Sequence, residues 1–545
     1  MTVDSLFTFF TALVISTAVI PLMIRVAPHI GMIDLPDARK VHASPTPRAG
    51  GIGIVVGTLI PILLWLPIDR TILAYVAGSI ILLFFGAWDD IHALSARVKI
   101  IGQILAASVV VYYGRVYVAT LPLMGLNSLP TVFAKPFTVF AIVGTINAMN
   151  VSDGLDGLAG GLSILSLCCI GYLAFQSQGL TAVAIAATTL GGVLGFMRYN
   201  TLPARVFMGD SGSQFLGFTL GFLAVFLVQQ VNPALSPALP LLFLGLPIAD
   251  LIAVIAQRLY LGISPFVATK HHVHHRLLGL GFDHYEAVVV IYALQSLLVV
   301  LALFMRYDMD GVILGAYFGI CISLFLYLYL ATRLGWHAHR TRVEPRLKRA
   351  IVAIRHHPLF TAVPVQIVTV AIPVLFLGVS LLCTRVPKDF AVGATALAAL
   401  LALQLILARA NGSLLLHAVS YVTAAFVIYL EGKYMGEQVL LFDYADIGYF
   451  VILAIAIGLA VRYAAKAEFK TTPMDYLVVL IVLSVGFLFR NNLTEAGIGA
   501  MVVKLMVVFY GCELIISRSR SRWNSLNISS LLTLSILGAR GLGIG

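Results

Sequence analysis

The sequence predicts an all-α fold, that of a polytopic integral membrane protein. Of its 545 residues, 60% are hydrophobic and only 11% are charged, and the mean hydropathy is +0.99. Apolar runs of about 17–25 residues, each long enough to cross the hydrocarbon core of a bilayer as a helix, recur along the whole chain. A soluble core of this size and composition is not expected.

The apolar runs form two groups that are separated by a basic stretch. Residues 1–335 hold about eleven predicted spans and form a first membrane domain. Residues 336–358 form a basic linker, predicted to be cytoplasmic, and residues 359–545 hold about six further spans of unknown function. The first group lies near 5–27, 50–68, 71–87, 99–118, 131–149, 158–176, 180–197, 213–230, 237–257, 286–305 and 311–333. The second lies near 361–383, 390–408, 414–430, 446–464, 475–490 and 496–516, and residues 525–537 are short enough to lie at the membrane interface.

The net charge of +11 is interpreted as a signal of topology, because Lys and Arg concentrate on the cytoplasmic side of membrane proteins. If the amino terminus is outside, the loops after the first, third, fifth, seventh and ninth spans are cytoplasmic, and these loops are rich in Lys and Arg. The opposite loops, such as 120–130 and 229–237, are short and almost uncharged. A nucleic-acid partner is not expected, and the five cysteines form no CxxC pair.

Five polar stretches fall in those same basic loops. Charged groups are costly near a bilayer and are seldom kept there without a chemical use. Their shared side predicts one site on the cytoplasmic face of the inner membrane. The five polar stretches are Arg39–Gly51 (RKVHASPTPRAGG), Trp88–Lys99 (WDDIHALSARVK), Asn147–Gly157 (NAMNVSDGLDG), Val206–Gly212 (VFMGDSG) and Lys270–Arg276 (KHHVHHR).

Asp89 and Asp90 follow the apolar end of the third span. Adjacent residues of a helix point about 100° apart, so the two carboxylates are expected to have different roles. One faces the reacting phosphate, and the other faces a metal, a lysine or a helix terminus. The alternative is a pair of exposed carboxylates at a helix end. Lys99 is expected to be their charge partner or a ligand of a substrate phosphate.

Asn147, Asn150, Asp153 and Asp156 follow one another at intervals of three residues. Neighbouring members of such a series share a helix face, and Gly154 allows the backbone to break and gather their oxygens. The alternative is a polar helix cap, with Asp156 as the N-cap of the next span. Two amides and two carboxylates at one membrane boundary favour a functional role.

Asp210 lies between glycines at the start of the eighth span. Close backbone approach and a helix amino terminus both favour phosphate binding there. Carboxylate and amide oxygens together with substrate phosphates are what Mg²⁺ prefers. The sequence therefore predicts Asp210 as the principal magnesium ligand, with Asp89 or Asn150 assisting.

The stretch Lys270–Arg276 contains four histidines and no carboxylate. Because its Lys and Arg would repel a metal cation, an anion site for a diphosphate or nucleotide is favoured over a transition-metal site. In the preceding span, Asp250 is an intramembrane carboxylate and therefore a functional candidate. Its alternative role is a hydrogen bond to a neighbouring helix.

The five polar stretches, in this order across about residues 35–280, resemble the polyprenyl-phosphate N-acetylhexosamine-1-phosphate transferases. The resemblance covers roughly residues 1–335. The run HHVHHRL resembles the bacterial branch that acts on UDP-N-acetylglucosamine and undecaprenyl phosphate and starts O-antigen, enterobacterial common antigen or teichoic-acid linkage units. The alternative is the phospho-MurNAc-pentapeptide transferase branch of peptidoglycan synthesis. That branch typically has an acidic residue after its histidines, where this chain has Arg276 and Leu277.

This resemblance implies that HexNAc-1-phosphate, most simply GlcNAc-1-phosphate, passes from a UDP-sugar to undecaprenyl phosphate. The products are undecaprenyl-diphosphate-HexNAc and UMP. Mg²⁺ is the implied cofactor, with Mn²⁺ as an alternative. The implied partners are the two substrates and membrane lipid. A homodimer, and binding of other polysaccharide-assembly proteins by the C-terminal region, are further expectations.

The resemblance also implies roles for individual residues. The catalytic residues are Asp89, Asp90 and Asp153. The nucleotide-sugar-binding residues are Lys99, Asn147, Asp156, His272, His274, His275 and Arg276. The metal ligands are Asp210 and Asn150, and Lys40 and His42 lie in a loop near the site. A phosphate monoester has a second pKa near 6, so a strong general base is not required.

The competing class is a polyprenyl-lipid transporter or carrier-binding protein. It predicts an inverted repeat and polar groups near the middle of the membrane, and the sequence shows neither. After residue 335 we find no second catalytic constellation. A mostly acidic loop there is expected to be a solvated face. It contains Glu431, Lys433, Glu437, Asp443 and Asp446.

Overall fold

The computed structural model describes residues 3–35, 45–121, 128–264, 272–338, 361–407, 413–435, 440–463, 493–518 and 523–543. Within them the fold is helical, apart from the short antiparallel pair β1 (Ile33–Asp34) and β2 (Thr46–Pro47). Ten of the described helices are long and apolar enough to cross a membrane. The prediction of an all-α, polytopic membrane protein is confirmed.

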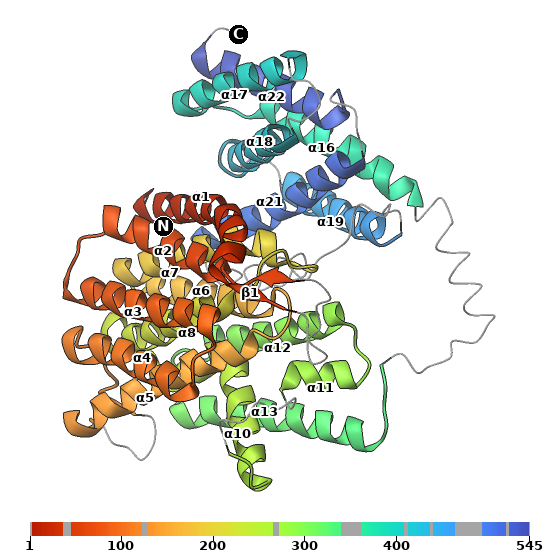
Figure 1. Ribbon diagram of the computed structural model, residues 1–545. Coiled ribbons are helices and arrows are strands. Elements are labelled where there is room, and N and C mark those ends of the chain that lie inside the picture. Colours follow the sequence, from red (N-terminus) through yellow and green to blue (C-terminus); the bar gives the residue numbers. More distant parts are fainter. Residues whose placement is uncertain are drawn as a thin grey trace. The chain divides into compact units, whose positions relative to one another are not determined.

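The chain divides into two compact units, one of Met1–Thr341 with Thr472–Leu480 and the other of Arg342–Thr471 with Ile481–Gly545. Figure 1 labels their helices. The first unit contains α1 (Val3–Val26), α2 (Gly50–Trp65), α3 (Arg70–His92), α4 (Ala96–Ser108), α5 (Thr131–Ser152), α6 (Leu158–Gln176), α7 (Leu180–Asn200), α8 (Gly209–Phe226), α9 (Pro240–Phe243), α10 (Gly245–Tyr260), α11 (Val273–Gly279), α12 (His284–Phe304) and α13 (Asp310–Arg333). Short turns η1 (Ala27–Ile30), η2 (Val109–Tyr113) and η3 (Leu227–Val231) extend α1, α4 and α8.

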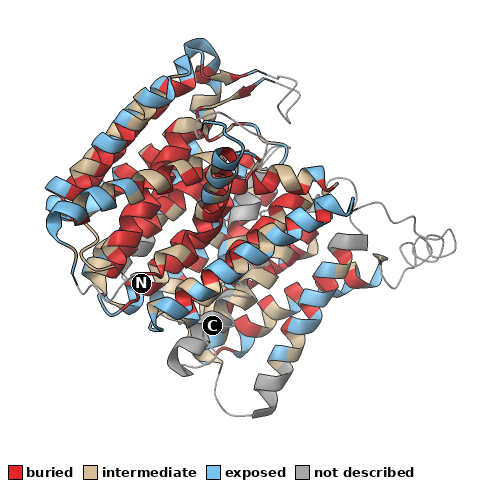
Figure 2. Cartoon of the chain, turned by 90° about the horizontal axis from the view of Figure 1, so that it is seen from below, coloured by how far each residue is buried: buried red, intermediate tan, exposed pale blue. Residues whose placement is uncertain are grey.

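Helix α8 lies at the centre of the first unit. Nearly all of its side chains are buried, and it packs against α2, α3 and α5. Helices α6 and α7 pack on each other and are also largely buried, while α1 packs against α2 and α7. In Figure 2 some helices are buried along nearly their whole length, while others carry exposed residues along one side. The central position of α8 fixes where its amino-terminal residues stand.

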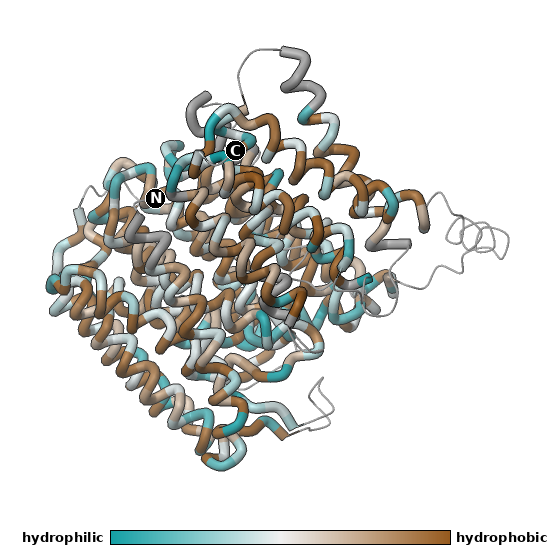
Figure 3. Tube along the Cα trace, turned by 90° about the horizontal axis from the view of Figure 1, so that it is seen from above, coloured by the Kyte–Doolittle hydropathy of each residue, from teal (hydrophilic) through white to brown (hydrophobic). Residues whose placement is uncertain are grey.

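Apolar side chains also cover the outside of the first unit. Phe84 of α3 is 62% exposed, and Phe140 of α5 is 74% exposed. Figure 3 shows hydrophobic residues predominating along the helices, with hydrophilic residues gathered toward helix ends and loops. Exposed apolar surface of this extent is unusual for a protein in water and fits contact with lipid chains.

The second unit has a hydrophobic core of its own. Its described helices are α16 (Val363–Leu382), α17 (Lys388–Leu407), α18 (Ser413–Tyr434), α19 (Leu440–Tyr463), α21 (Leu493–Arg518) and α22 (Ser525–Leu542). Helix α22 is longer than the short interfacial segment that the sequence predicts, and it packs against α16 and α17. The predicted span at 475–490, and all but the first residues of the predicted linker 336–358, lie outside the described residues.

One prediction about the second unit is wrong for two of its five residues: Lys433 is exposed as expected, and the side chains of Glu437 and Asp443 lie outside the described residues. Glu431 of α18 and Asp446 of α19 were expected on a solvated face, but both pair with Lys504 of α21, at 2.5 and 2.6 Å. The Lys504 side chain is only 17% exposed. Its pairing partners lie about sixty and seventy residues away in the sequence, so this ion-pair cluster could not be predicted from a local sequence pattern.

Candidate active site

The described parts of the polar stretches meet at one end of the first unit's helices. The described part of the first stretch (Arg39–Gly51) lies along the fourth stretch (Val206–Gly212). The Phe207 amide donates to the Pro47 carbonyl (2.7 Å), and the Gly51 amide donates to the Met208 carbonyl (2.8 Å). A Cβ at Gly51 would lie 2.1 Å from the Gly212 nitrogen. The glycines of RAGG and GDSG therefore let two backbones touch.

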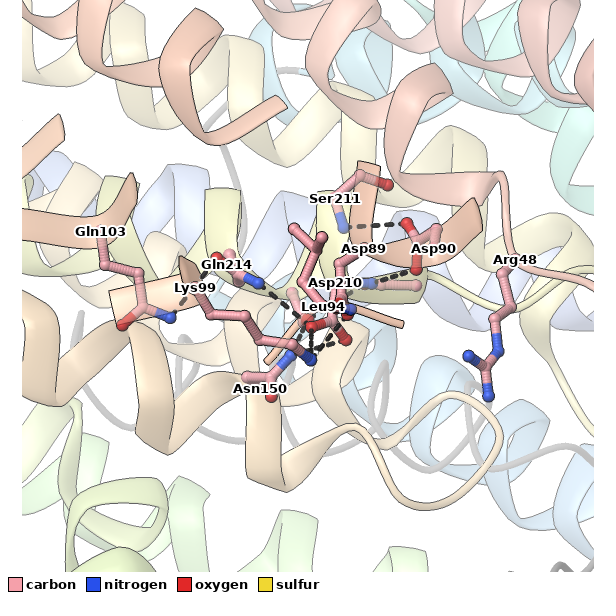
Figure 4. A network of polar contacts seen from close by, with 12 residues as sticks. Arg48, Asp89, Asp90, Leu94, Lys99, Gln103, Asn150, Asp210, Ser211 and Gln214 are labelled. Atoms are coloured by element: carbon pink, nitrogen blue, oxygen red, sulfur yellow. Dashed lines mark hydrogen bonds and ion pairs between the residues drawn. The ribbon is translucent and has the colours of Figure 1, made fainter. Parts of the chain in front are cut away.

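Asp90 caps the amino terminus of α8. Its Oδ1 accepts from the Asp210 amide (2.8 Å), and its Oδ2 accepts from the Ser211 amide (3.1 Å) (Figure 4). Gly209 supplies the sharp entry to this helix with a φ of +72°, and a Cβ there would lie 2.7 Å from the Asp90 oxygens. Both carboxylate oxygens are used and the side chain is buried. Of the roles left open by the sequence, Asp90 takes that of facing a helix terminus.

Lys99 joins the carboxylates of two helices. Its Nζ lies 2.6 Å from Asp89 Oδ2 and 2.8 Å from Asp210 Oδ2 (Figure 4). The other Asp89 oxygen accepts from the Leu94 amide (2.6 Å), which holds the carboxylate at the end of α3. Lys99 itself lies in the first turn of α4. Asp89 therefore has the lysine partner that was one of the alternatives predicted for the Asp89–Asp90 pair.

Two side-chain amides fix the Asp210 carboxylate. Asn150 Nδ2 donates to Asp210 Oδ1 (3.1 Å) and to Ser213 Oγ (2.9 Å), and Gln214 Nε2 donates to Asp210 Oδ2 (3.1 Å). Asn150 therefore turns its amino group, and not its oxygen, toward Asp210. The role of Asn150 as a direct metal ligand stays a prediction. Its hydrogen bond to Asp210 holds the Asp210 carboxylate in place.

Buried glutamines continue this network, and the sequence interpretation missed them. Gln103 Nε2 donates to Gln214 Oε1 (3.4 Å), and Asn147 Nδ2 donates to Gln103 Oε1 (2.7 Å). Gln103 and Gln214 are 2% and 1% exposed. Each lies four residues after a charged site residue, Lys99 and Asp210 respectively, and so on the same helix face. That spacing was the signal that could have found them.

The turn between α5 and α6 brings Asp153 and Asp156 to the same end of the unit. Asp156 Oδ2 accepts from the Ala204 amide (2.9 Å) and so connects this turn to the loop before α8. Gly157, and not Asp156, occupies the N-cap of α6. The helix-cap alternative for Asp156 is therefore not what the structure shows. Asn200, also missed from the sequence, accepts from the Gly157 amide (2.9 Å).

Asp153 follows the last turn of α5. Burial raises the pKa of its carboxyl to about 7, and the negative charges of Asp210, Asp90 and Asp156 act in the same direction, while Arg48 opposes them. Because this folded-state pKa exceeds the ordinary value near 4, the folded protein holds a proton that the unfolded chain loses. Folding stability therefore falls as the pH rises from about 4 to 7, and stays lower above 7.

Replacement of Asp153 by asparagine is expected to remove this loss. Without Mg²⁺ and substrates, the variant should be more stable than the wild type at pH 8, on the order of 2 kcal/mol, and similar near pH 4. Thermal unfolding in detergent over this pH range measures the difference. The exposed Asp308→Asn change is the control and should run parallel to the wild type. If the stability of Asp153→Asn depends on pH in the same way as that of the wild type, the raised pKa of the Asp153 carboxyl is contradicted.

The three described histidines of the fifth stretch lie on and beside the short helix α11. His272 and His274 are buried, and His275 is partly exposed with its ring 4.2 Å from that of His274. Burial, and next the neighbouring His275, lower the pKa of His274 to about 3, so His274 is neutral at physiological pH. It contributes a packed, uncharged ring to the expected anion site.

Helix α11 packs against the turn that follows α5. A Cβ at Gly154 would lie 2.4 Å from His274 Nε2, so the fifth stretch touches the third there. Arg276 donates to Gln257 Oε1 of α10 (2.6 Å), and its guanidinium lies 5.9 Å from the Phe325 ring centre. Lys40, His42 and the first two residues of the fifth stretch lie outside the described residues.

The charges of the site suit a divalent cation. Asp89 and Asp210 pair with Lys99, and Asp153 feels the negative charges of Asp210, Asp90 and Asp156, whereas Arg48 pairs with Asp34. Within the described ranges, no three or more His, Cys, Asp or Glu side chains form a metal cage. Mg²⁺ needs no such cage, because it usually takes one or two carboxylates together with waters and substrate phosphates. Asp89 and Asp210, which already hold one ammonium group between them, fit this requirement.

Comparison with known proteins supplies an independent finding. The family model "Glycosyl transferase family 4" matches residues 72–228, which contain Asp89, Lys99, Asn150 and Asp210. A probable undecaprenyl-phosphate N-acetylglucosaminyl 1-phosphate transferase of Bacillus subtilis (strain 168) is 34% identical over 301 residues, covering 55% of this chain and 84% of the relative. The undecaprenyl-phosphate alpha-N-acetylglucosaminyl 1-phosphate transferase of Escherichia coli (strain K12) is 31% identical over 348 residues, covering 60% and 90%. A decaprenyl-phosphate N-acetylglucosaminephosphotransferase of Mycolicibacterium smegmatis is 35% identical over 294 residues, covering 48% and 72%.

Proposed function

Because the chain belongs to glycosyl transferase family 4, the polyprenyl-phosphate N-acetylhexosamine-1-phosphate transferases, we propose that its first unit transfers HexNAc-1-phosphate from a UDP-sugar to undecaprenyl phosphate. GlcNAc-1-phosphate is the group proposed, since the relatives are named for N-acetylglucosaminyl 1-phosphate transfer. The products are undecaprenyl-diphosphate-GlcNAc and UMP. The observation that carries the proposal is the meeting of Asp89, Lys99 and Asp210 at the start of α8.

The proposed reaction is a phosphoryl transfer between two anions. An oxygen of the lipid phosphate bonds to the β-phosphorus of the UDP-sugar, the bond from that phosphorus to the bridging oxygen breaks, and the oxygen leaves with UMP. Such transfers depend on positioning and on charge stabilisation. Lys99 supplies a cation at the site, and Asp90, Asn150 and Gln214 hold the α8 start and Asp210 in place.

Magnesium is part of the proposal. Asp89 and Asp210 would hold the ion, which when bound neutralises phosphate charge. Asp89 requires no great basicity, because the lipid phosphate is largely dianionic at neutral pH. We therefore assign Asp89 to orientation of the cations and the lipid phosphate. Asp153 and Asp156 stay the predicted acids on the nucleotide side.

The site is proposed to face the cytoplasm of the inner membrane. The described part of the first stretch, the α7–α8 loop and α11 lie at the site end of the first unit, and they carry Arg48, Arg205 and Arg276. The loops predicted for the other side of the membrane are almost uncharged. Both substrates of the proposed reaction fit this position, since nucleotide sugars are made in the cytoplasm.

The test incubates purified protein with Mg²⁺, undecaprenyl phosphate and each of a panel of labelled nucleotide sugars, including UDP-MurNAc-pentapeptide. We expect butanol-extractable label and an equal amount of UMP with UDP-GlcNAc. Transfer from UDP-MurNAc-pentapeptide alone would assign the chain to the peptidoglycan branch. No transfer from any UDP-HexNAc by folded protein would overturn the proposal.

A further inference from the structure

Helix α10 holds α11 at two points. Asp250 Oδ1 accepts from the Val273 amide (2.9 Å), and Asp250 Oδ2 lies 2.9 Å from His272 Nδ1. Seven residues further along α10, Gln257 Oε1 accepts from Arg276 (2.6 Å). Two helix turns separate the two α10 residues, so both lie on one face. Through these hydrogen bonds that face helps to hold α11, which also packs on α12.

The Asp250 contact also determines which nitrogen of His272 is left for other partners. A carboxylate on Nδ1 keeps a proton on that nitrogen and turns Nε2 away from α10. The contact is well enclosed, since the side chains of Asp250 and His272 are 7% and 9% exposed. Its geometry is therefore set by packing as well as by the hydrogen bond.

The placement of α11 reaches the site through its histidines. The rings of His272 and His274 stack at 5.8 Å, and His274 contacts the Gly154 position of the α5–α6 turn. That turn carries Asp153 and Asp156. The hydrogen bonds of Asp250 go to His272 and Val273, at the start of α11, whereas Lys99 pairs with Asp89 and Asp210.

We infer that Asp250 is a positioning residue for the nucleotide-sugar side of the site. It fixes the His272 ring and the first turn of α11, and so aligns the histidines with the α5–α6 turn where the UDP-sugar binds. The inference rests on the proposed function. It adds Asp250 to the residues of the site and predicts that Asp250 affects binding of the UDP-sugar. An effect on the UDP-sugar, and not on the lipid phosphate, is its distinguishing consequence.

The test compares Asp250→Asn and Asp250→Glu with the wild type, by steady-state kinetics in each substrate. Asparagine still accepts from the Val273 amide, but its amino group donates to His272 Nδ1 and so moves the proton to Nε2. We expect the KM for UDP-GlcNAc to rise about tenfold to a hundredfold, as for other residues that orient a ligand-binding histidine. The KM for undecaprenyl phosphate should stay within about twofold. Glutamate keeps the charge and both acceptors, and should restore most of the affinity.

Asp310→Asn is the matched control, since Asp310 accepts a hydrogen bond from Ser236 at the start of α13 and contacts none of the site residues named above. It should leave both KM values unchanged. Equal rises in both KM values for Asp250→Asn, no rise, or the same KM in the asparagine and glutamate variants would overturn the inference while the proposed function stands. A folded wild type that transfers no label would overturn both.

Discussion

Replacement of Asp210 by asparagine is expected to lower the rate of sugar-phosphate transfer by about a hundredfold to a thousandfold. Asp210 accepts from Asn150 and Gln214, pairs with Lys99, and starts the most buried helix of the first unit. Asparagine keeps the size of the side chain but removes its charge. The proposed cation site would then lose one of its two carboxylates, and the charge balance around Lys99 would change. Initial rates at saturating substrates, over a range of Mg²⁺ concentrations, measure the effect.

The matched control is the same change at Asp69, the N-cap of α3. Asp69 caps that helix by accepting from the Ile72 amide (2.7 Å), a contact that asparagine retains. Asp69→Asn should keep the rate within about twofold of the wild type. A fully active Asp210→Asn enzyme with the wild-type dependence on Mg²⁺ would remove Asp210 from the site.

The second large effect is expected for Lys99→Met. The change leaves Asp89 and Asp210 facing each other without their ammonium partner, and the loss of one member of an enclosed ion pair costs about 3 kcal/mol. Transfer should fall at least a hundredfold. If Mg²⁺ binds at the proposed site, it would supply the missing positive charge, so we expect it to raise the melting temperature of Lys99→Met more than that of the wild type. Thermal unfolding with Mg²⁺ and with EDTA measures this difference.

Lys135→Met is the control for the lysine change. Lys135 of α5 stacks over Tyr112 at 5.3 Å and takes part in none of the site contacts. Its loss should affect neither transfer nor the stabilisation by Mg²⁺. If Mg²⁺ stabilises Lys99→Met no more than the wild type, the space between Asp89 and Asp210 is not the cation site.

Much of the fold was predictable because each span is a local property of the sequence. A sufficiently long run of apolar residues is enough to predict a membrane helix. The predicted spans of residues 5–27 to 311–333 accordingly correspond to described helices of the first unit. The family was predictable for a related reason, since five ordered stretches resemble it and the comparisons confirm it. Helix α22 was harder, because its apolar run is interrupted by polar residues that turn out to be buried.

The roles within the site were less predictable, because they depend on partners far away in the sequence. Lys99 meets Asp210 across 111 residues, and the Asp90 carboxylate meets the Asp210 amide across 120. The sequence shows that adjacent aspartates point in different directions, but not which one reaches α8. The neutral state of His274 likewise follows from burial, which a run of polar letters does not reveal.

The second unit illustrates the same limit. Glu431 lies near the end of α18, Asp446 lies near the start of α19, and Lys504 lies within an apolar run of α21, so their pairing cannot be read from the sequence. The described part of this unit holds no counterpart of the site in the first unit. Its predicted roles, in a dimer or in binding other assembly proteins, stay predictions.

The central claim is that the first unit transfers a sugar together with its phosphate. The most direct measurement uses UDP-GlcNAc that carries tritium in the sugar and radioactive phosphorus in the β-phosphate, with undecaprenyl phosphate as the acceptor. We predict that both labels enter the lipid fraction in a one-to-one ratio while UMP is released. Entry of tritium without the phosphorus label, with release of UDP, would show transfer of the sugar alone and would contradict the account.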